Sequence, residues 1–159
     1  MLTSRYTVVP LRILLVLLFA LIGLFQVMSM PGQFRHMAEE DPDMAYLRWP
    51  LTAISVLVLL CVQVVIVCTW KLLTMVQEDR IFSDRAFVWV DAIVGAIGVA
   101  WVVIAGLFLY VGFTADDPGV PLLLTLVLLF GAVLGMLILV MRALLRQATA
   151  LRSDMEAVI

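Results

Sequence analysis

The sequence predicts an all-α, polytopic membrane protein with four transmembrane helices in an up-down bundle and a helical cytoplasmic tail. Of its 159 residues, 65% are hydrophobic and 14% are charged, whereas soluble domains are about 45–50% apolar. The apolar residues form four blocks, each long enough to cross about 30 Å of hydrocarbon at about 1.5 Å per residue. We therefore expect a single transmembrane domain that comprises residues 1–159.

The first span is expected at about residues 11–30. Its apolar run follows a basic segment, as in a secretory signal peptide, but no A-x-A-like cleavage site comes after it, which favours a retained helix. Pro31 and Gly32 are expected to end this helix, because Pro lacks an amide donor and Gly favours the left-handed cap conformation. The segment from Gln33 to Trp49 is then predicted to be an acidic loop.

The other spans are expected at about residues 51–73, 87–111 and 120–141. Small residues can bring two of these helices close together. In the third span they recur every fourth position, and in the fourth they form a GxxxG pair; these residues are Ala92, Ala96, Ala100, Gly131 and Gly135. Neither Pro nor Gly follows Met141, and apolar residues continue at helical spacing, so the cytoplasmic tail, residues 142–159, is predicted to extend the last helix.

A short cytoplasmic elbow, residues 76–86, is predicted between the second and third spans. Ser83 fits the N-cap of the third helix, and Asp84 in the first turn complements the helix dipole. Phe82 and Phe87 have the spacing of a hydrophobic staple around that cap. The elbow should therefore be an ordered turn.

Basic residues lie mostly on one side of the predicted topology. Placing both termini and the elbow together gives eight basic residues on that side and two, Arg35 and Arg48, on the other; the eight are Arg5, Arg12, Lys71, Arg80, Arg85, Arg142, Arg146 and Arg152. The positive-inside rule then predicts that both termini are cytoplasmic.

Composition also narrows the setting. The formal charge of −2 and the absence of a run of basic residues argue against direct nucleic acid binding. There are nine Arg, one Lys and no Asn, a bias that indicates a GC-rich coding sequence and favours a bacterial plasma membrane.

Asp91 lies about one turn inside the third span, where an ionised carboxylate is costly and tends to be paired or functional. Arg142, at the cytoplasmic end of the fourth span, should lie at a similar depth in an antiparallel neighbour. We expect an intramembrane ion pair between them, with Arg85 or Arg146 as alternative partners. A coupling switch and part of a transport path remain alternatives for Asp91.

No catalytic constellation is found in the sequence. There is no Gly-rich phosphate loop and no pair of intramembrane His residues that could ligate haem. His36 and the nearby carboxylates Glu39, Glu40, Asp41 and Asp43 fit a solvated acidic loop better than a metal site, which would normally use more His or Cys. We expect no cofactor, no metal and no enzymatic activity.

Two motifs resemble a known family: the elbow EDRIFSDRAF, Glu78 to Phe87, and the ending LRSDMEAVI, Leu151 to Ile159. Together they are similar to a widespread bacterial family of four-span membrane proteins catalogued as a domain of unknown function. Many relatives have Gly where this chain has Asp79 and Arg80. Members are often encoded beside a very small helix-turn-helix regulator of the Cro-repressor type, which implies such a regulator as a partner.

These observations favour a non-enzymatic membrane protein that anchors or signals to a small cytoplasmic partner. The docking surface is expected to use the elbow and the tail, with these candidate residues: Glu78, Asp79, Arg80, Phe82, Arg85, Arg146 and Arg152. The alternatives are a subunit of a transporter or channel, which would have to be a homo-oligomer because four helices with few polar groups cannot line a wide path, and a structural partner in a membrane complex.

Overall fold

The structure is a computed structural model that describes residues 2–158, apart from the side chains of residues 2–5 and of Met44. The side chain of Arg5 and residue Ile159, both included in the expectations above, lie outside the described part.

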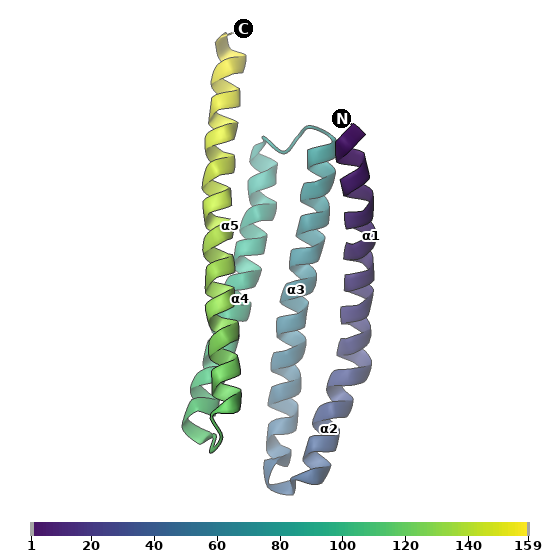
Figure 1. The fold of residues 1–159 in the computed structure, drawn as a ribbon, viewed down its shortest axis with the longest axis vertical. Coiled ribbons are helices and arrows are strands. Elements are labelled where there is room, and N and C mark those ends of the chain that lie inside the picture. Colours follow the sequence, from purple (N-terminus) through teal and green to yellow (C-terminus); the bar gives the residue numbers. More distant parts are fainter. Residues whose placement is uncertain (1, 159) are drawn as a thin grey trace. The chain divides into compact units, whose positions relative to one another are not determined.

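The described chain is helical and contains no strand. Figure 1 shows α1 (Leu2–Leu24), the π-helix η1 (Phe25–Ser29), α2 (Met30–Glu40), the 3-10 helix η2 (Pro42–Leu47), α3 (Arg48–Gln77), α4 (Asp84–Thr114) and α5 (Gly119–Val158). Four stretches are long and apolar enough to cross a membrane: Tyr6–Glu40, Ala45–Gln77, Asp84–Thr114 and Gly119–Val158. The predicted all-α fold, with four helices that could cross a membrane and a helical tail, is confirmed.

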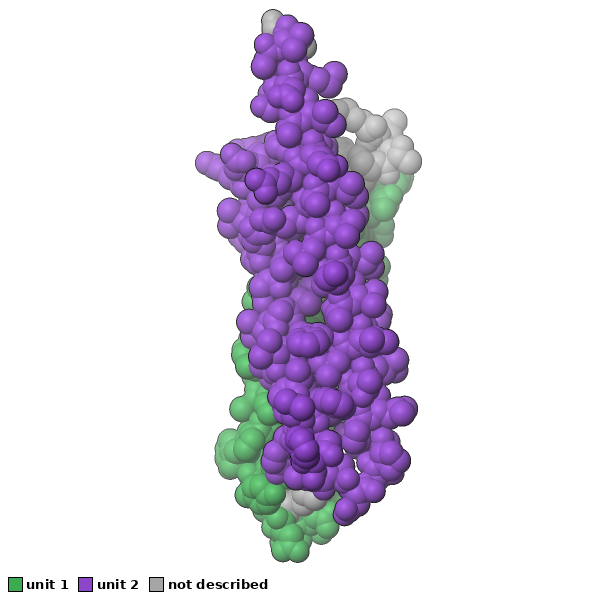
Figure 2. Space-filling view, turned by 90° about the vertical axis from the view of Figure 1, so that its left-hand side faces the viewer, with its two compact units in different colours: residues 1–66 green, residues 67–159 purple. Residues whose placement is uncertain are grey.

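The chain divides into two compact units, residues 1–66 and 67–159, coloured green and purple in Figure 2. The boundary falls inside α3, so this helix contributes its first part to one unit and its last part to the other. Each unit is described separately below.

In the first unit, the prediction that Pro31 and Gly32 end the first helix is wrong. The chain remains helical to Glu40, because the π-helical turn of η1 precedes Pro31 and the Met30 N–H bonds to the Phe25 carbonyl, five residues back. A wider turn accommodates the missing amide and the ring of Pro31, which would clash in a regular α-helix. Within η1, Gln26 Nε2 donates a hydrogen bond to the Val56 carbonyl of α3 at 3.3 Å.

The acidic loop predicted from Gln33 to Trp49 is also mostly helical, since it forms the end of α2, all of η2 and the start of α3. Two side-chain pairs at i,i+4 spacing lie on α2: Arg35 with Glu39 at 3.0 Å, and His36 with Glu40 at 3.3 Å. Such pairs each stabilise a helix by about 0.2–0.5 kcal/mol. The acidic side chains therefore occupy a helical surface.

In the second unit, α4 and α5 form an antiparallel hairpin joined at residues 115–118. The predicted helix contact at the GxxxG pair is present. A Cβ on Gly131 would meet Cδ1 of Trp101 at 3.2 Å, and one on Gly135 would meet Cγ2 of Ile97 at 3.7 Å. Trp101 also donates its indole N–H to the Leu128 carbonyl of α5 at 2.9 Å. Large side chains of α4 thus lie over the glycines of α5, and they do not come from the predicted alanine positions.

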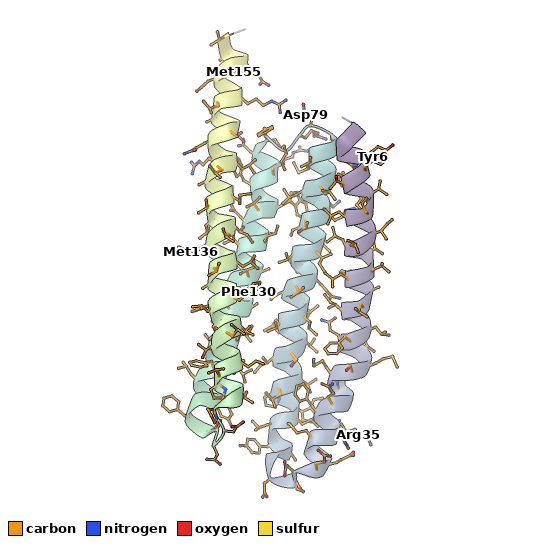
Figure 3. The ribbon with its side chains drawn as sticks, in the orientation of Figure 1. Tyr6, Arg35, Asp79, Phe130, Met136 and Met155 are labelled. Carbon is orange, nitrogen blue, oxygen red and sulfur yellow. The ribbon has the colours of Figure 1, made fainter. Side chains whose placement is uncertain are left out.

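The long helices expose most of their apolar side chains. Figure 3 shows the side chains along them, and Phe130 and Met136 of α5 are 68% and 66% exposed. In water such a surface would be unstable, whereas hydrocarbon covers it at no cost. The exposure agrees with a chain surrounded by lipid.

The glycine contact generates a test. Gly131→Ala should lower the stability of the hairpin relative to Gly106→Ala, because a Cβ at position 131 meets Trp101 whereas one at position 106 has no neighbour within 4 Å. We expect a difference of about 1–3 kcal/mol, measured by denaturation of the purified protein in mixed micelles. A Gly131→Ala variant as stable as Gly106→Ala would contradict the described contact.

Candidate functional site

The elbow is held by hydrogen bonds at the end of α3. The Arg80 N–H bonds to the Met75 carbonyl at 2.8 Å, and the Asp79 N–H bonds to the Val76 carbonyl at 3.2 Å. This pair of bonds is the Schellman motif, whose left-handed residue is usually Gly. Here that residue is Asp79, with φ at 54°. Asp tolerates this conformation better than most residues with a side chain, so the turn forms without the Gly expected from relatives.

At the other end of the elbow, Ser83 precedes α4 as predicted and has extended backbone angles, φ −132° and ψ 156°. Its hydroxyl does not cap the helix. It donates instead to the Arg80 carbonyl at 2.7 Å. The prediction of the helix start is confirmed and the prediction of a side-chain cap is wrong, because Ser83 turns its hydroxyl back to the Arg80 carbonyl and does not accept a bond from an N–H group of the first turn of α4.

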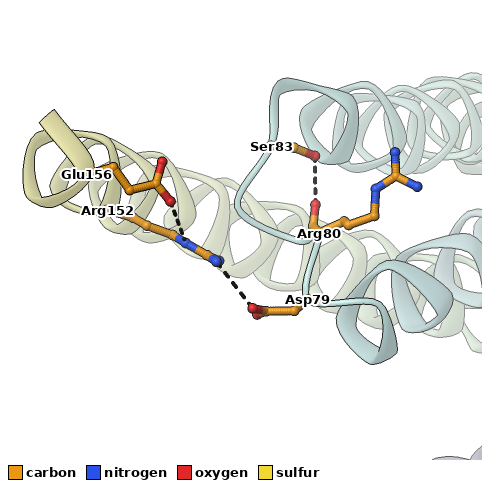
Figure 4. A network of polar contacts seen from close by, with 5 residues as sticks. All are labelled: Asp79, Arg80, Ser83, Arg152 and Glu156. Atoms are coloured by element: carbon orange, nitrogen blue, oxygen red, sulfur yellow. Dashed lines mark hydrogen bonds and ion pairs between the residues drawn. The ribbon is translucent and has the colours of Figure 1, made fainter. Parts of the chain in front are cut away.

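Arg152 of α5 connects the elbow with the tail (Figure 4). Its Nη2 lies 3.2 Å from Oδ2 of Asp79, and its Nε lies 3.6 Å from Oε1 of Glu156. The guanidinium also lies over the ring of Phe82, 5.2 Å from the centroid, a favourable cation–π arrangement. One arginine thus joins two elbow residues to the last turns of α5.

The elbow, the start of α4 and the tail part of α5 line an open groove of about 650 Å³, which we name the elbow groove. It includes five of the seven predicted docking residues, together with side chains from α4 and α5; its lining is Asp79, Arg80, Phe82, Ser83, Asp84, Arg85, Thr149, Arg152, Ser153 and Glu156. The other two predicted residues lie outside it. Glu78 pairs with Arg80 at 3.4 Å, and Arg146 lines a neighbouring pocket.

The structure brings Asp91 and Arg142 together. Arg142 Nη2 donates to Oδ2 of Asp91 at 3.1 Å, and Nε donates to Oδ1. This bidentate geometry neutralises the Asp91 carboxylate near the start of α4. Neither of the alternative partners, Arg85 and Arg146, forms a hydrogen bond or an ion pair with any described residue.

The tail carries an exposed row of apolar side chains, which we name the apolar stripe. Its members follow the 4-3-4-3 spacing of a coiled-coil seam: Leu144, Ala148, Leu151, Met155 and Val158. Leu151, Met155 and Val158 are 65%, 70% and 88% exposed. At about 100° per residue the stripe lies on a different side of α5 from the residues that line the elbow groove, so the elbow leaves it uncovered.

Sequence reasoning missed three of these features. The left-handed residue Asp79 could have been inferred from the Gly that the family resemblance implies at this turn, and the bond from Trp101 could have been inferred from an indole donor inside an apolar span, which must find an acceptor. The apolar stripe was visible only in part, as Leu144, Ala148 and Leu151. The described residues contain no group of three or more His, Cys, Asp or Glu side chains that could hold a metal ion.

Two substitutions at Asp79 test whether this position requires a left-handed backbone conformation. Asp79→Ala should destabilise the protein by about 1–2 kcal/mol, because Ala is strained at a positive φ, while Asp79→Gly should be more stable than Asp79→Ala although both lose the contact with Arg152. Thermal denaturation in detergent would measure this order. The reverse order would contradict the left-handed backbone conformation of Asp79.

The ion pair can be tested by a double-mutant cycle. Arg142→Gln leaves an unpaired carboxylate, so it should destabilise the protein more than the double variant Asp91→Asn with Arg142→Gln. Denaturation in mixed micelles should therefore show a favourable coupling between the two side chains, as expected for residues in contact. Strictly additive effects would indicate that the two side chains do not interact.

The region matched in the comparisons with known proteins includes the α4–α5 hairpin and both segments of the candidate site, the elbow and the tail. The family model described as "Protein of unknown function (DUF2975)" matches residues 32–159, which include α3, the elbow, α4 and α5. No curated protein and no solved structure matches the chain. Because the match extends over most of the chain, this protein belongs to that family of unknown function.

Proposed function

We propose that this chain is a non-enzymatic integral membrane protein of the bacterial plasma membrane that anchors or signals to a small cytoplasmic partner. The positive-inside distribution of its arginines supports an arrangement with both termini in the cytoplasm. The observation that carries the proposal is the apolar stripe on α5.

The stripe lies on the part of α5 that continues past the predicted fourth span. The helix is a single unbroken element of 40 residues, about 60 Å long, which is twice the thickness of the hydrocarbon core. Because the tail continues the axis of its own span, it cannot turn to lay an apolar face on the membrane surface. Its exposed apolar residues therefore need a protein partner, and their spacing suits a helix laid alongside or a groove that accepts α5.

The elbow groove adds a polar surface next to the tail. It carries both signs of charge: Asp79, Asp84 and Glu156 against Arg80, Arg85 and Arg152. Such a lining suits a protein surface of mixed charge better than a strongly charged small ligand. Arg152 keeps the groove in shape by joining Asp79, Phe82 and Glu156, so a partner would meet a preformed site.

The helix-turn-helix regulator implied by the family resemblance has the size and the helical structure that these surfaces would suit. It is small and helical, and a helix of such a protein could complete the seam formed by the apolar stripe. Binding to the tail would keep the regulator at the membrane and away from other targets.

A transporter or channel subunit is supported less well. Two of the polar groups in the spans are already engaged within the chain, since Gln26 bonds to Val56 and Asp91 pairs with Arg142. A polar path would need such groups to face a common lumen.

The proposal is tested by photo-crosslinking in native membranes. A photoreactive residue at Met155 should capture a soluble cytoplasmic protein, and the same residue at Ala157 should not, because it lies about 200° further around the helix at nearly the same height. Mass spectrometry would identify the captured protein. Charged substitutions at Leu151 and Leu144 should abolish the product, whereas Ala150→Asp, off the stripe, should leave it.

Other outcomes would overturn the proposal. Capture of a second copy of this chain alone would make the stripe a self-association surface. Capture of lipid alone would mean that the tail docks no protein, and equal capture at Met155 and Ala157 would mean that the stripe does not select one.

A further inference from the structure

A second pocket lies between α4 and α5 where the apolar part of the hairpin ends. It has a volume of about 390 Å³, and we name it the boundary pocket. Its polar lining comes from both helices: Asp84 on α4, and Arg142, Arg146, Thr149 and Ser153 on α5. Because Arg142 directly follows the apolar run of the fourth span, the pocket lies at the level of the lipid headgroups.

The charges in the boundary pocket reduce to one of each sign. Arg142 is neutralised by Asp91. The side chains of Arg146 and Asp84 have no hydrogen bond or ion pair with any described residue, and they do not pair with each other although they line the same pocket. A free guanidinium and a free carboxylate therefore face one cavity, which is the complement of a zwitterion.

An apolar pocket of about 330 Å³ lies deeper between the same two helices. Gly98 and Trp101 line it from α4, and Ala132, Gly135 and Leu139 line it from α5. Steps of three and four residues lead from Ala132 through Gly135 and Leu139 to Arg142 and Arg146, so both pockets lie on one face of α5. The small residues leave room there for a hydrocarbon chain.

We propose that these two pockets together bind one phosphatidylethanolamine molecule. Its phosphate pairs with Arg146, its primary ammonium donates hydrogen bonds to Asp84, and one acyl chain lies in the apolar pocket beside Trp101. A phosphatidylglycerol headgroup has hydroxyl donors but no cation to compensate the charge of Asp84. The trimethylammonium of phosphatidylcholine has no N–H to donate. The site is separate from the apolar stripe, although Asp84, Thr149 and Ser153 also line the elbow groove, and lipid binding can be measured without the protein partner.

Native mass spectrometry of the full chain in detergent would test the site, by titration with the three phospholipids carrying identical acyl chains. Phosphatidylethanolamine should bind about tenfold more tightly than phosphatidylcholine, the usual effect of a hydrogen bond to a charged group. Phosphatidylglycerol should also bind more weakly than phosphatidylethanolamine. A tightest complex with phosphatidylglycerol, or equal binding of all three, would overturn the proposal.

Variants separate the two charges and the acyl chain. Asp84→Ala, which removes the acceptor for the ammonium N–H groups, should lower phosphatidylethanolamine binding to the level of phosphatidylcholine, and Arg146→Gln should weaken all three lipids. Gly98→Phe, which has open space around its Cβ, should fill the apolar pocket and weaken all three while keeping their order. The matched control is Arg85→Gln. Arg85 is an unpaired arginine outside the boundary pocket, so this variant should leave the binding of all three lipids unchanged. Retained selectivity in Asp84→Ala would refute the assignment of the ammonium.

Discussion

The close approach of α4 to α5 determines where every proposed surface lies. Helices in lipid gain no hydrophobic stabilisation from meeting each other, so they rely on close packing and on hydrogen bonds. Here Gly131 and Gly135 admit Trp101 and Ile97, and the indole bond to Leu128 fixes the register. Because both helices are long and regular, that register also places Asp91 opposite Arg142 and the elbow opposite Arg152.

The spans, the helical tail and the meeting of Asp91 with Arg142 could be predicted from the sequence, since they follow from hydrophobic length and from depth along antiparallel helices. The continuation past Pro31 could not, because single-residue rules assume α-helical hydrogen bonding and η1 departs from it. The hydroxyl of Ser83 and the ring of Trp101 depend on which acceptor is nearest in space. Local patterns carry no information about that choice.

The candidate site was predicted in outline for a related reason. Unpaired charges are costly in hydrocarbon, so the sequence places most charged residues in the segments outside the spans, and the elbow and the tail are two of these segments. The different roles of these charged residues emerge from contacts: Arg152 binds Asp79, Phe82 and Glu156, whereas Arg85 and Arg146 have no partner among the described side chains. The paired arginine shapes the surface, and an unpaired arginine is available to a ligand.

The unbroken course of α5 has a mechanical consequence. A helix without Pro, Gly or a π turn between Arg142 and Val158 behaves as a stiff lever whose pivot lies in the bilayer. The part beyond the pivot is about 25 Å long, so a tilt of about 10° in the membrane displaces its tip by about 4 Å. Changes in bilayer thickness alter helix tilt. Any tilt of α5 in a membrane would therefore be amplified as a sideways displacement of the end of the tail.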